Sequence, residues 1–188
     1  DQVIIPSGNF TIEEEDKIHF TADVKDLGNF LLEANLVKSP FKNIMISGSG
    51  RIGFYLADAL SKKKYAVKLI EENLKAAEEL AEELPNVTVI HGNGTQHDLL
   101  VEEGIEAMDA FVALTDNDEE NIIVSMFANK KKVKKTITKV KLDDLLGMLD
   151  ELGIDNYVSP KNIVASRIIS YVRALANSRG SNVLTLYR

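Results

Sequence analysis

Short apolar runs alternate with helical patterns along most of the chain, and this alternation restricts the possible folds more than any other feature. The runs are rich in Ile, Val and Leu, as strands are when both faces of a sheet are covered. They lie at 44–46, 67–70, 87–90, 110–114, 137–140 and 157–158. Strands that alternate with helices form βαβ units. The sequence therefore predicts an α/β fold, with a doubly wound parallel sheet of six strands.

Composition excludes several classes of protein. The chain carries 29 acidic and 22 basic residues, for a net charge of −7, and it has no cysteine. An acidic chain is a poor binder of nucleic acid backbones, so we expect no nucleic acid partner. The lack of cysteine excludes disulfides, thiolate metal sites and cysteine nucleophiles. No apolar run approaches the roughly 18 residues of a membrane-spanning helix, so we expect no direct membrane insertion.

The sequence pattern divides the chain into four parts. Residues 1–22 carry short β-branched and aromatic runs between turn residues, a pattern typical of β-hairpins, but this segment is too short for its own core. We expect it to be the tail of a preceding domain. Helical spacing predicts a linking helix within 23–40, and the doubly wound domain occupies 41–177. Residues 178–188 are expected to begin a following domain, so we expect a piece of a longer protein.

A glycine-rich turn follows the first predicted strand and precedes a predicted helix. It consists of Gly48, Ser49, Gly50, Arg51, Ile52 and Gly53. In a Rossmann-like GxGxxG turn, the first glycine makes the bend, the second lets a pyrophosphate approach, and the third lets the helix pack on the sheet. The amides and dipole of the helix N-terminus favour an anion there. The pattern predicts a nucleotide site, and a glycine-rich turn without a ligand is the alternative.

An acidic residue ends the second predicted strand. Glu71 lies 21 residues beyond Gly50, which is the spacing of the carboxylate that accepts hydrogen bonds from a ribose in dinucleotide-binding domains. A carboxylate at this point repels a 2′-phosphate. The residue therefore favours NAD(H), ATP or ADP over NADP, and an exposed acid at a strand end is the alternative.

Polar residues also follow the third and fourth predicted strands. Asn93 and Gly94 lie in a turn whose glycines would allow a base to approach, although an ordinary turn is nearly as favoured. Thr115 and Asp116 lie beside the point where the strand order reverses, which is where such sheets bind ligands. We expect Asp118 to cap the helix that follows.

Three separated motifs carry a resemblance to a known family. They span 46–53, 91–95 and 111–121. Together they resemble the TrkA family, the peripheral nucleotide-binding subunits of bacterial and archaeal potassium uptake systems, whose domains are called RCK (regulator of potassium conductance). The resemblance covers about residues 43–173. Residues 1–21 are similar to the final strands of an RCK C-terminal domain, which implies that one domain pair ends here and the Rossmann half of a second pair follows.

The resemblance also implies roles for individual residues. Residues 48–52 would line the phosphates of the ligand and Glu71 would hold its ribose. Thr115, Asp116 and Lys139 would lie near the other end of the ligand.

Three of the predicted site residues, Arg51, Asn93 and Lys139, have individual features. Arg51 is a natural partner for a phosphate. Relatives often carry arginine where Lys139 stands, and lysine keeps the charge without the bidentate fork. Asn93 replaces a frequent aspartate.

The resemblance implies a function as well. The protein would be a non-enzymatic cytoplasmic regulator on the inner face of the membrane, with NAD(H) as ligand or else ATP or ADP, and it would control a membrane potassium transporter subunit. It would form a homodimer or a higher ring, and the apolar helix predicted at 160–177 is wide enough to pair with a second subunit. An NAD-dependent oxidoreductase and an assembly module with a vestigial site are the alternatives. The sequence leaves open which ligand is physiological and in which direction it gates.

The only basic cluster and the histidines indicate no separate function. Lys130–Lys135 is a lysine-rich run that fits a solvated helix end better than a lipid or nucleic acid patch. His91 and His97 lack the spacing of a metal site.

Overall fold

The chain divides between Pro40 and Phe41 into two units. The computed structural model describes residues 8–11, 13, 22–34 and 41–178. In the first unit, helix α1 (Val24–Glu33) lies inside the segment predicted as a linking helix. The predicted hairpin strands fall largely outside the described residues, as does the segment 179–188. The assignment of these segments to flanking domains stays a prediction.

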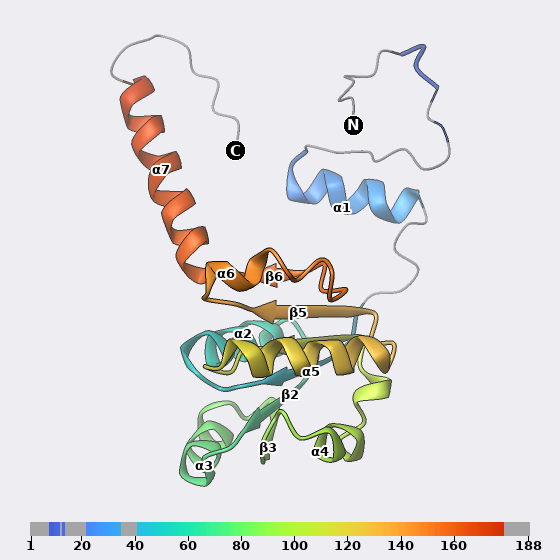
Figure 1. The fold of residues 1–188 in the computed structure, drawn as a ribbon, viewed down its shortest axis with the longest axis vertical. Helices are drawn as coiled ribbons and strands as arrows, with labels where there is room; N and C mark the ends of the chain where they lie inside the picture. Colours follow the sequence, from blue (N-terminus) through green and yellow to red (C-terminus); the bar gives the residue numbers. More distant parts are fainter. Residues whose placement is uncertain (1–7, 12, 14–21, 35–40, 179–188) are drawn as a thin grey trace. The chain divides into compact units, whose positions relative to one another are not determined.

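The described part of the second unit, residues 41–178, contains a single parallel sheet of six strands (Figure 1). Its strands are β1 (Asn43–Ser47), β2 (Ala66–Glu71), β3 (Val87–His91), β4 (Ala110–Ala113), β5 (Lys135–Lys139) and β6 (Tyr157–Val158). They lie in the order β3-β2-β1-β4-β5-β6, and every neighbouring pair is parallel. This confirms the predicted doubly wound sheet. The order reverses between β1 and β4, where such sheets bind their ligands at the carboxyl ends of the strands. We call that side the carboxyl edge and the opposite side the amino edge.

Helices cover both faces of this sheet. Helices α2 (Arg51–Lys62) and α3 (Leu74–Glu83) pack on one face, and α4 (His97–Glu102), a 3₁₀ turn (Ile105–Ala107) and α5 (Asp118–Lys130) pack on the other. Helix α6 (Asp143–Leu146) packs near α5, and α7 (Pro160–Ser178) extends away from the sheet (Figure 1). Successive residues of a strand point to opposite faces. Ile46 of β1 therefore packs with Ala57 of α2 and Leu80 of α3, whereas its neighbour Met45 packs with Val124 of α5. Burial on both faces explains the continuous apolar runs of the sequence.

A half-buried aspartate, Asp109, connects several segments at the amino edge. The Asp109 carboxylate accepts hydrogen bonds from the backbone N–H groups of Lys42 (2.8 Å) and Asn43 (3.0 Å) and from the Lys134 ammonium (2.7 Å). The Lys134 contact is the largest cause of a pKa of Asp109 that lies well below its ordinary value, and the two amides add to it. This residue joins the starts of β1 and β4 to the segment before β5.

Two lysines of the lysine-rich run at the end of α5 form ion pairs with other segments. Lys131 forms an ion pair with Glu106 at 2.6 Å, and Lys134 pairs with Asp109. The run therefore contributes contacts to the fold, which the prediction of a solvated helix end did not include.

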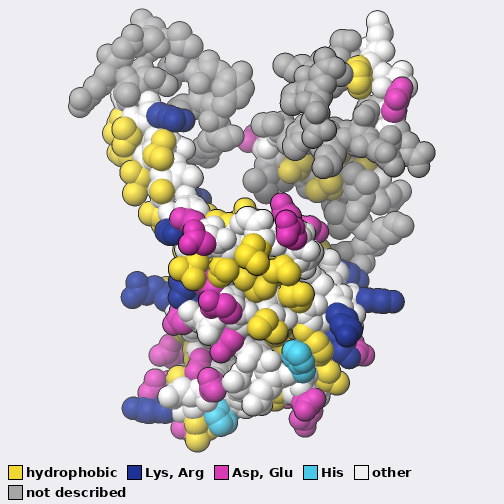
Figure 2. Space-filling view, in the orientation of Figure 1, with side chains coloured by type: hydrophobic (Ala, Val, Ile, Leu, Met, Phe, Trp, Pro, Cys, Tyr) yellow, Lys and Arg dark blue, Asp and Glu magenta, His cyan; other side chains and the backbone are white. Residues whose placement is uncertain are grey.

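Helix α7 presents many apolar side chains to solvent. It begins at Pro160, as predicted. Seven of its large apolar residues are between 47% and 66% exposed: Ile163, Val164, Ile168, Ile169, Tyr171, Val172 and Leu175. Figure 2 shows these apolar groups gathered along the helix. An ion pair between Lys161 and Asp143 (2.8 Å) joins its first turn to α6. No helix among the described residues is long and apolar enough to cross a membrane.

Candidate functional site

The three motif glycines between β1 and α2 have three different environments. Gly48 has a φ of +101°, and a Cβ there would lie 2.7 Å from the backbone nitrogen of Thr115. A Cβ on Gly53 would lie 2.1 Å from the carbonyl oxygen of Gly48. A Cβ on Gly50 would meet no atom within 4 Å. Packing thus explains the first and third glycines, whereas the second faces open space, as the approach of a pyrophosphate requires.

The N-terminus of α2 begins at this open position. Gly50 is the N-cap and provides no side chain to bind the first amides. The first N–H groups of a helix have no partner within the helix, so they and the helix dipole attract an anion. Arg51 is exposed and forms no ion pair with any described residue. The side chain of Ile52 is 44% exposed. The residues predicted to line the phosphates therefore border an accessible turn that carries free helix amides and one exposed cation, Arg51.

The structure brings Glu71 into contact with this loop. One carboxylate oxygen, Oε2, accepts a hydrogen bond from the Ser49 hydroxyl. The other, Oε1, accepts one from the backbone N–H of Asn73 at 2.7 Å. The carboxylate is thus held beside the glycine loop, in the position that a ribose-binding acid would need.

The turn after β3 is explained largely by its own contacts. Asn93 Oδ1 accepts hydrogen bonds from the N–H (2.8 Å) and the hydroxyl (2.6 Å) of Thr95. A Cβ on Gly94 would lie 2.2 Å from the hydroxyl oxygen of Ser47, which donates to the Gly94 carbonyl at 3.0 Å. Close packing on β1 accounts for this glycine without a ligand. A role for Asn93 and Gly94 in binding a base stays a prediction.

A fully buried asparagine organises the ends of β4 and β5. Asn121 Oδ1 accepts hydrogen bonds from the N–H (2.9 Å) and hydroxyl (2.8 Å) of Thr115. Its Nδ2 donates to the carbonyl oxygens of Thr115 (3.0 Å) and Lys139 (3.1 Å). Sequence reasoning did not identify this role. The only available signal was a polar residue where the helical pattern calls for an apolar one.

A buried lysine completes the carboxyl edge. The side chain of Lys139 is 8% exposed, and its ammonium donates to the Leu114 carbonyl at 3.0 Å and to Asp116 Oδ1 at 3.2 Å. Asp116 itself is 98% exposed. An ammonium has three N–H groups, and no described residue accepts the third. Thr115, Asp116 and Lys139 therefore lie together, with one cationic donor left for a ligand.

The predicted cap of α5 is wrong. Asn117, not Asp118, caps the helix, since its Oδ1 accepts from the N–H of Glu120 at 3.0 Å. Asp118 is the first helical residue and turns inward. Its Oδ2 accepts hydrogen bonds from the N–H groups of Lys141 (2.6 Å) and Leu142 (2.8 Å). Both residue types can cap a helix, and only the position just before the helix has the extended backbone that a cap needs.

Known proteins share this sequence and fold. Residues 44–160 match the family model described as the TrkA-N domain. A Trk system potassium uptake protein TrkA from Vibrio alginolyticus is 36% identical over 170 residues, which cover 90% of this chain and 37% of that protein. A TrkA homologue from Methanosarcina mazei is 33% identical over 98% of this chain and 45% of its own length. The chain thus spans less than half the length of these curated relatives.

Solved structures with low sequence identity share the fold. The Kef C-terminal domain of Shewanella denitrificans, in an AMP-bound form, superposes with a TM-score of 0.61 at 17% identity, over 75% of this chain and 84% of that one. The GsuK channel bound to NAD gives a TM-score of 0.55 at 20% identity, over 72% of this chain and 27% of that one. The family model covers most of the sheet and its glycine loop, so the chain belongs to the TrkA-N domain family.

Proposed function

We propose that this chain is a nucleotide-binding regulatory part of a potassium uptake system. NAD(H), or else ATP or ADP, binds at the carboxyl edge and controls the conformation of a membrane potassium transporter. The Trk uptake relatives support the biological setting, and the neighbours solved with NAD and with AMP support an adenine nucleotide as ligand. In this proposal the protein works in the cytoplasm, on the inner face of the membrane, and catalyses no reaction.

The observation that carries the proposal is the juxtaposition of Gly50 and Glu71. The open space over Gly50 faces the first amides of α2, and Ser49 connects this loop to the carboxylate. A pyrophosphate over Gly50 would bind the amides while the adenosine ribose binds Glu71. Two ribose hydroxyls would replace the single hydroxyl of Ser49. The net gain is one hydrogen bond to a charged group.

Control of a transporter requires that the ligand have different affinities for two conformations of the regulatory protein. The far end of the ligand would reach Lys139, at the end of β5. This strand pairs with β6, which leads directly into α7. We propose that α7 pairs with a second copy through its exposed apolar side chains, because a symmetric dimer is the commonest way to cover such a surface. Sedimentation velocity at high micromolar concentration tests the dimer, and a monomer there would contradict it.

Calorimetric titration with NADH, ATP and NADPH tests the nucleotide site. We expect NADH to bind more tightly than NADPH. Glu71→Gln should weaken NADH binding by about 1.5–3 kcal/mol, the value of one hydrogen bond to a charged group. Glu78→Gln is the matched control, since Glu78 is exposed on α3 and should leave binding unchanged. Equal affinities for NADH and NADPH would contradict the proposed role of Glu71. A chain that binds no nucleotide would support the alternative of an assembly module with a vestigial site.

A further inference from the structure

Asp116 lies in the loop that follows β4, and two lysines at and just after the end of β5 hold its carboxylate. Its Oδ1 lies 3.2 Å from the ammonium of Lys139 and 3.9 Å from that of Lys141. The Lys141 ammonium also donates to the Asp116 carbonyl oxygen at 2.5 Å. Although Asp116 is 98% exposed, these contacts keep its carboxylate against the buried side chain of Lys139.

The ammonium of Lys139 lies beside the glycine loop, although the backbone of Lys139 belongs to β5. It donates to the carbonyl oxygen of Leu114 at 3.0 Å, and the same oxygen lies 2.9 Å from the position that a Cβ on Gly48 would take. The neighbouring strands of the sheet lie in the order β2-β1-β4. A ligand whose ribose binds Glu71 and whose pyrophosphate lies over Gly50 would therefore continue toward β4 and reach this ammonium.

The charge of Asp116 affects what kind of group can bind there. The Lys139 ammonium has three N–H groups, of which two bind Leu114 and Asp116 and none of the others binds a described residue. A ribose hydroxyl can accept the third N–H and also donate to the Asp116 carboxylate. A phosphate can accept the same N–H, but its negative charge would lie beside the carboxylate, and like charges in contact oppose binding. Asp116 therefore favours a ligand whose distal part carries no negative charge.

The two acids that follow Asp116 most closely do not share this position. Asp118 is 3% exposed, and its Oδ2 accepts hydrogen bonds from the backbone N–H groups of Lys141 and Leu142. Glu119 is exposed in the first turn of α5. Of the acids in this part of the chain, Asp116 is the one that contacts the Lys139 ammonium.

We propose that Asp116 is a specificity-determining residue of the candidate nucleotide site and shifts its preference from ATP toward NAD(H). This inference rests on the proposed nucleotide-binding function. A dinucleotide continues from its pyrophosphate into a ribose and a nicotinamide, which add no negative charge. ATP continues into a further phosphate, which must displace the carboxylate from Lys139 or bind beside it.

Calorimetric titration of the chain with ATP, NADH and AMP tests the proposal. EDTA is present throughout, because a divalent cation between the phosphate and the carboxylate would mask their repulsion. Asp116→Asn removes the charge and keeps the size of the side chain. We expect it to raise the affinity for ATP by about tenfold or more and to change that for NADH by less than about threefold. The affinity for AMP should stay the same, because its single phosphate does not extend to Lys139.

Glu119→Gln is the matched control. It changes the net charge by the same amount at an exposed position three residues away, without removing a contact to Lys139. The ratio of the ATP and NADH affinities should stay within about twofold of the wild-type ratio, since surface charges that are not in contact are largely screened.

A double-mutant cycle tests whether Asp116 acts through Lys139. In a Lys139→Gln background, Asp116→Asn should raise the affinity for ATP by less than about threefold, because the contact that it releases is already absent. Thermal unfolding checks that each variant is folded. Asp116 is exposed, so the single variant decides the proposal even if Lys139→Gln does not fold.

Three results would overturn the proposal. The first is an unchanged ratio of ATP and NADH affinities in Asp116→Asn, which would leave the nucleotide site itself in place if NADH binding still requires Glu71. The second is a loss of ATP affinity in Asp116→Asn, which would show that the carboxylate assists the phosphate. The third is an equal rise in ATP affinity in Glu119→Gln, which would show an effect of net charge alone. A chain that binds none of the three nucleotides would refute the site, and the role of Asp116 with it.

Discussion

The two edges of the sheet use their carboxylates in different ways. At the amino edge, Asp109 is 13% exposed and holds two backbone amides and an ammonium, all within 3.0 Å. At the carboxyl edge, Glu71 holds one amide and one serine hydroxyl, and the space beside Gly50 is open. The Asp109 contacts join strands that must stay together. The serine contact of Glu71 can be exchanged for a ligand without separating any strand. A polar cluster therefore indicates a binding site only when its bonds are exchangeable.

Valine substitutions at two glycines of the loop should have the largest effects, because one should affect nucleotide binding and the other the stability of the fold. Gly50→Val should fold normally and lose nucleotide affinity by more than about a hundredfold, because its side chain would occupy the pyrophosphate space. Gly53→Val should lower the free energy of unfolding by about 3 kcal/mol, since backbone atoms leave its Cβ no room. Urea unfolding and calorimetric titration measure the two effects. Unchanged affinity in folded Gly50→Val would place the ligand elsewhere.

Removing the asparagine that joins β4, α5 and β5 should have an intermediate effect. Asn121→Ala leaves the buried groups of Thr115 without partners, and we expect the free energy of unfolding to fall by about 2–3 kcal/mol. NADH should bind more weakly because Lys139 loses its support. AMP should bind almost unchanged, because it would use the Glu71 end alone. Equal losses for NADH and AMP would show that Asn121 does not act on one end of the site.

The smallest effect should come from the amino edge, as a change in pH dependence. The folded pKa of Asp109 is lowered, so its stabilising contribution is present above the unfolded value of about 3.9 and is lost as the pH falls toward the folded value. Asp109→Asn should therefore be less stable than the wild type at neutral pH and should show a shallower loss of Tm in acid. Asp144→Asn, an exposed acid on α6, is the control and should keep the wild-type acid profile.

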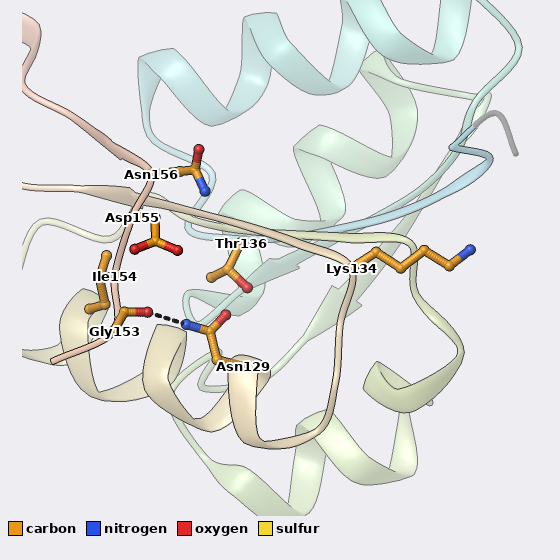
Figure 3. A pocket seen from close by; sticks show the side chains of 7 residues that line it. All are labelled: Asn129, Lys134, Thr136, Gly153, Ile154, Asp155 and Asn156. Atoms are coloured by element: carbon orange, nitrogen blue, oxygen red, sulfur yellow. Dashed lines mark hydrogen bonds between the residues drawn. The ribbon is translucent and has the colours of Figure 1, made fainter. Parts of the chain in front are cut away.

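Patterns that are local in sequence predicted the strands and the glycine loop. They did not predict contacts between residues that are far apart in the sequence. The apolar runs located the strands, and the spacing of Gly50 and Glu71 was sufficient to place both at the carboxyl edge. Asp109 binds the backbone of Asn43 across 66 residues of sequence, and no period of two or 3.6 residues carries that information. The same holds for the polar cavity lined by Asn129, Thr136 and Asp155, which forms only where α5, β5 and the segment before β6 meet (Figure 3).

The backbone N–H of Asn73, which holds one oxygen of the Glu71 carboxylate, affects the entropy of binding. A free glutamate side chain loses rotamer freedom when a ligand immobilises it, at a cost of about 0.5–1.5 kcal/mol. The bond from the Asn73 N–H, which the ribose does not displace, already restricts the Glu71 carboxylate in the ligand-free protein. That loss of freedom therefore occurs during folding, and an arriving ribose meets a carboxylate that is already oriented.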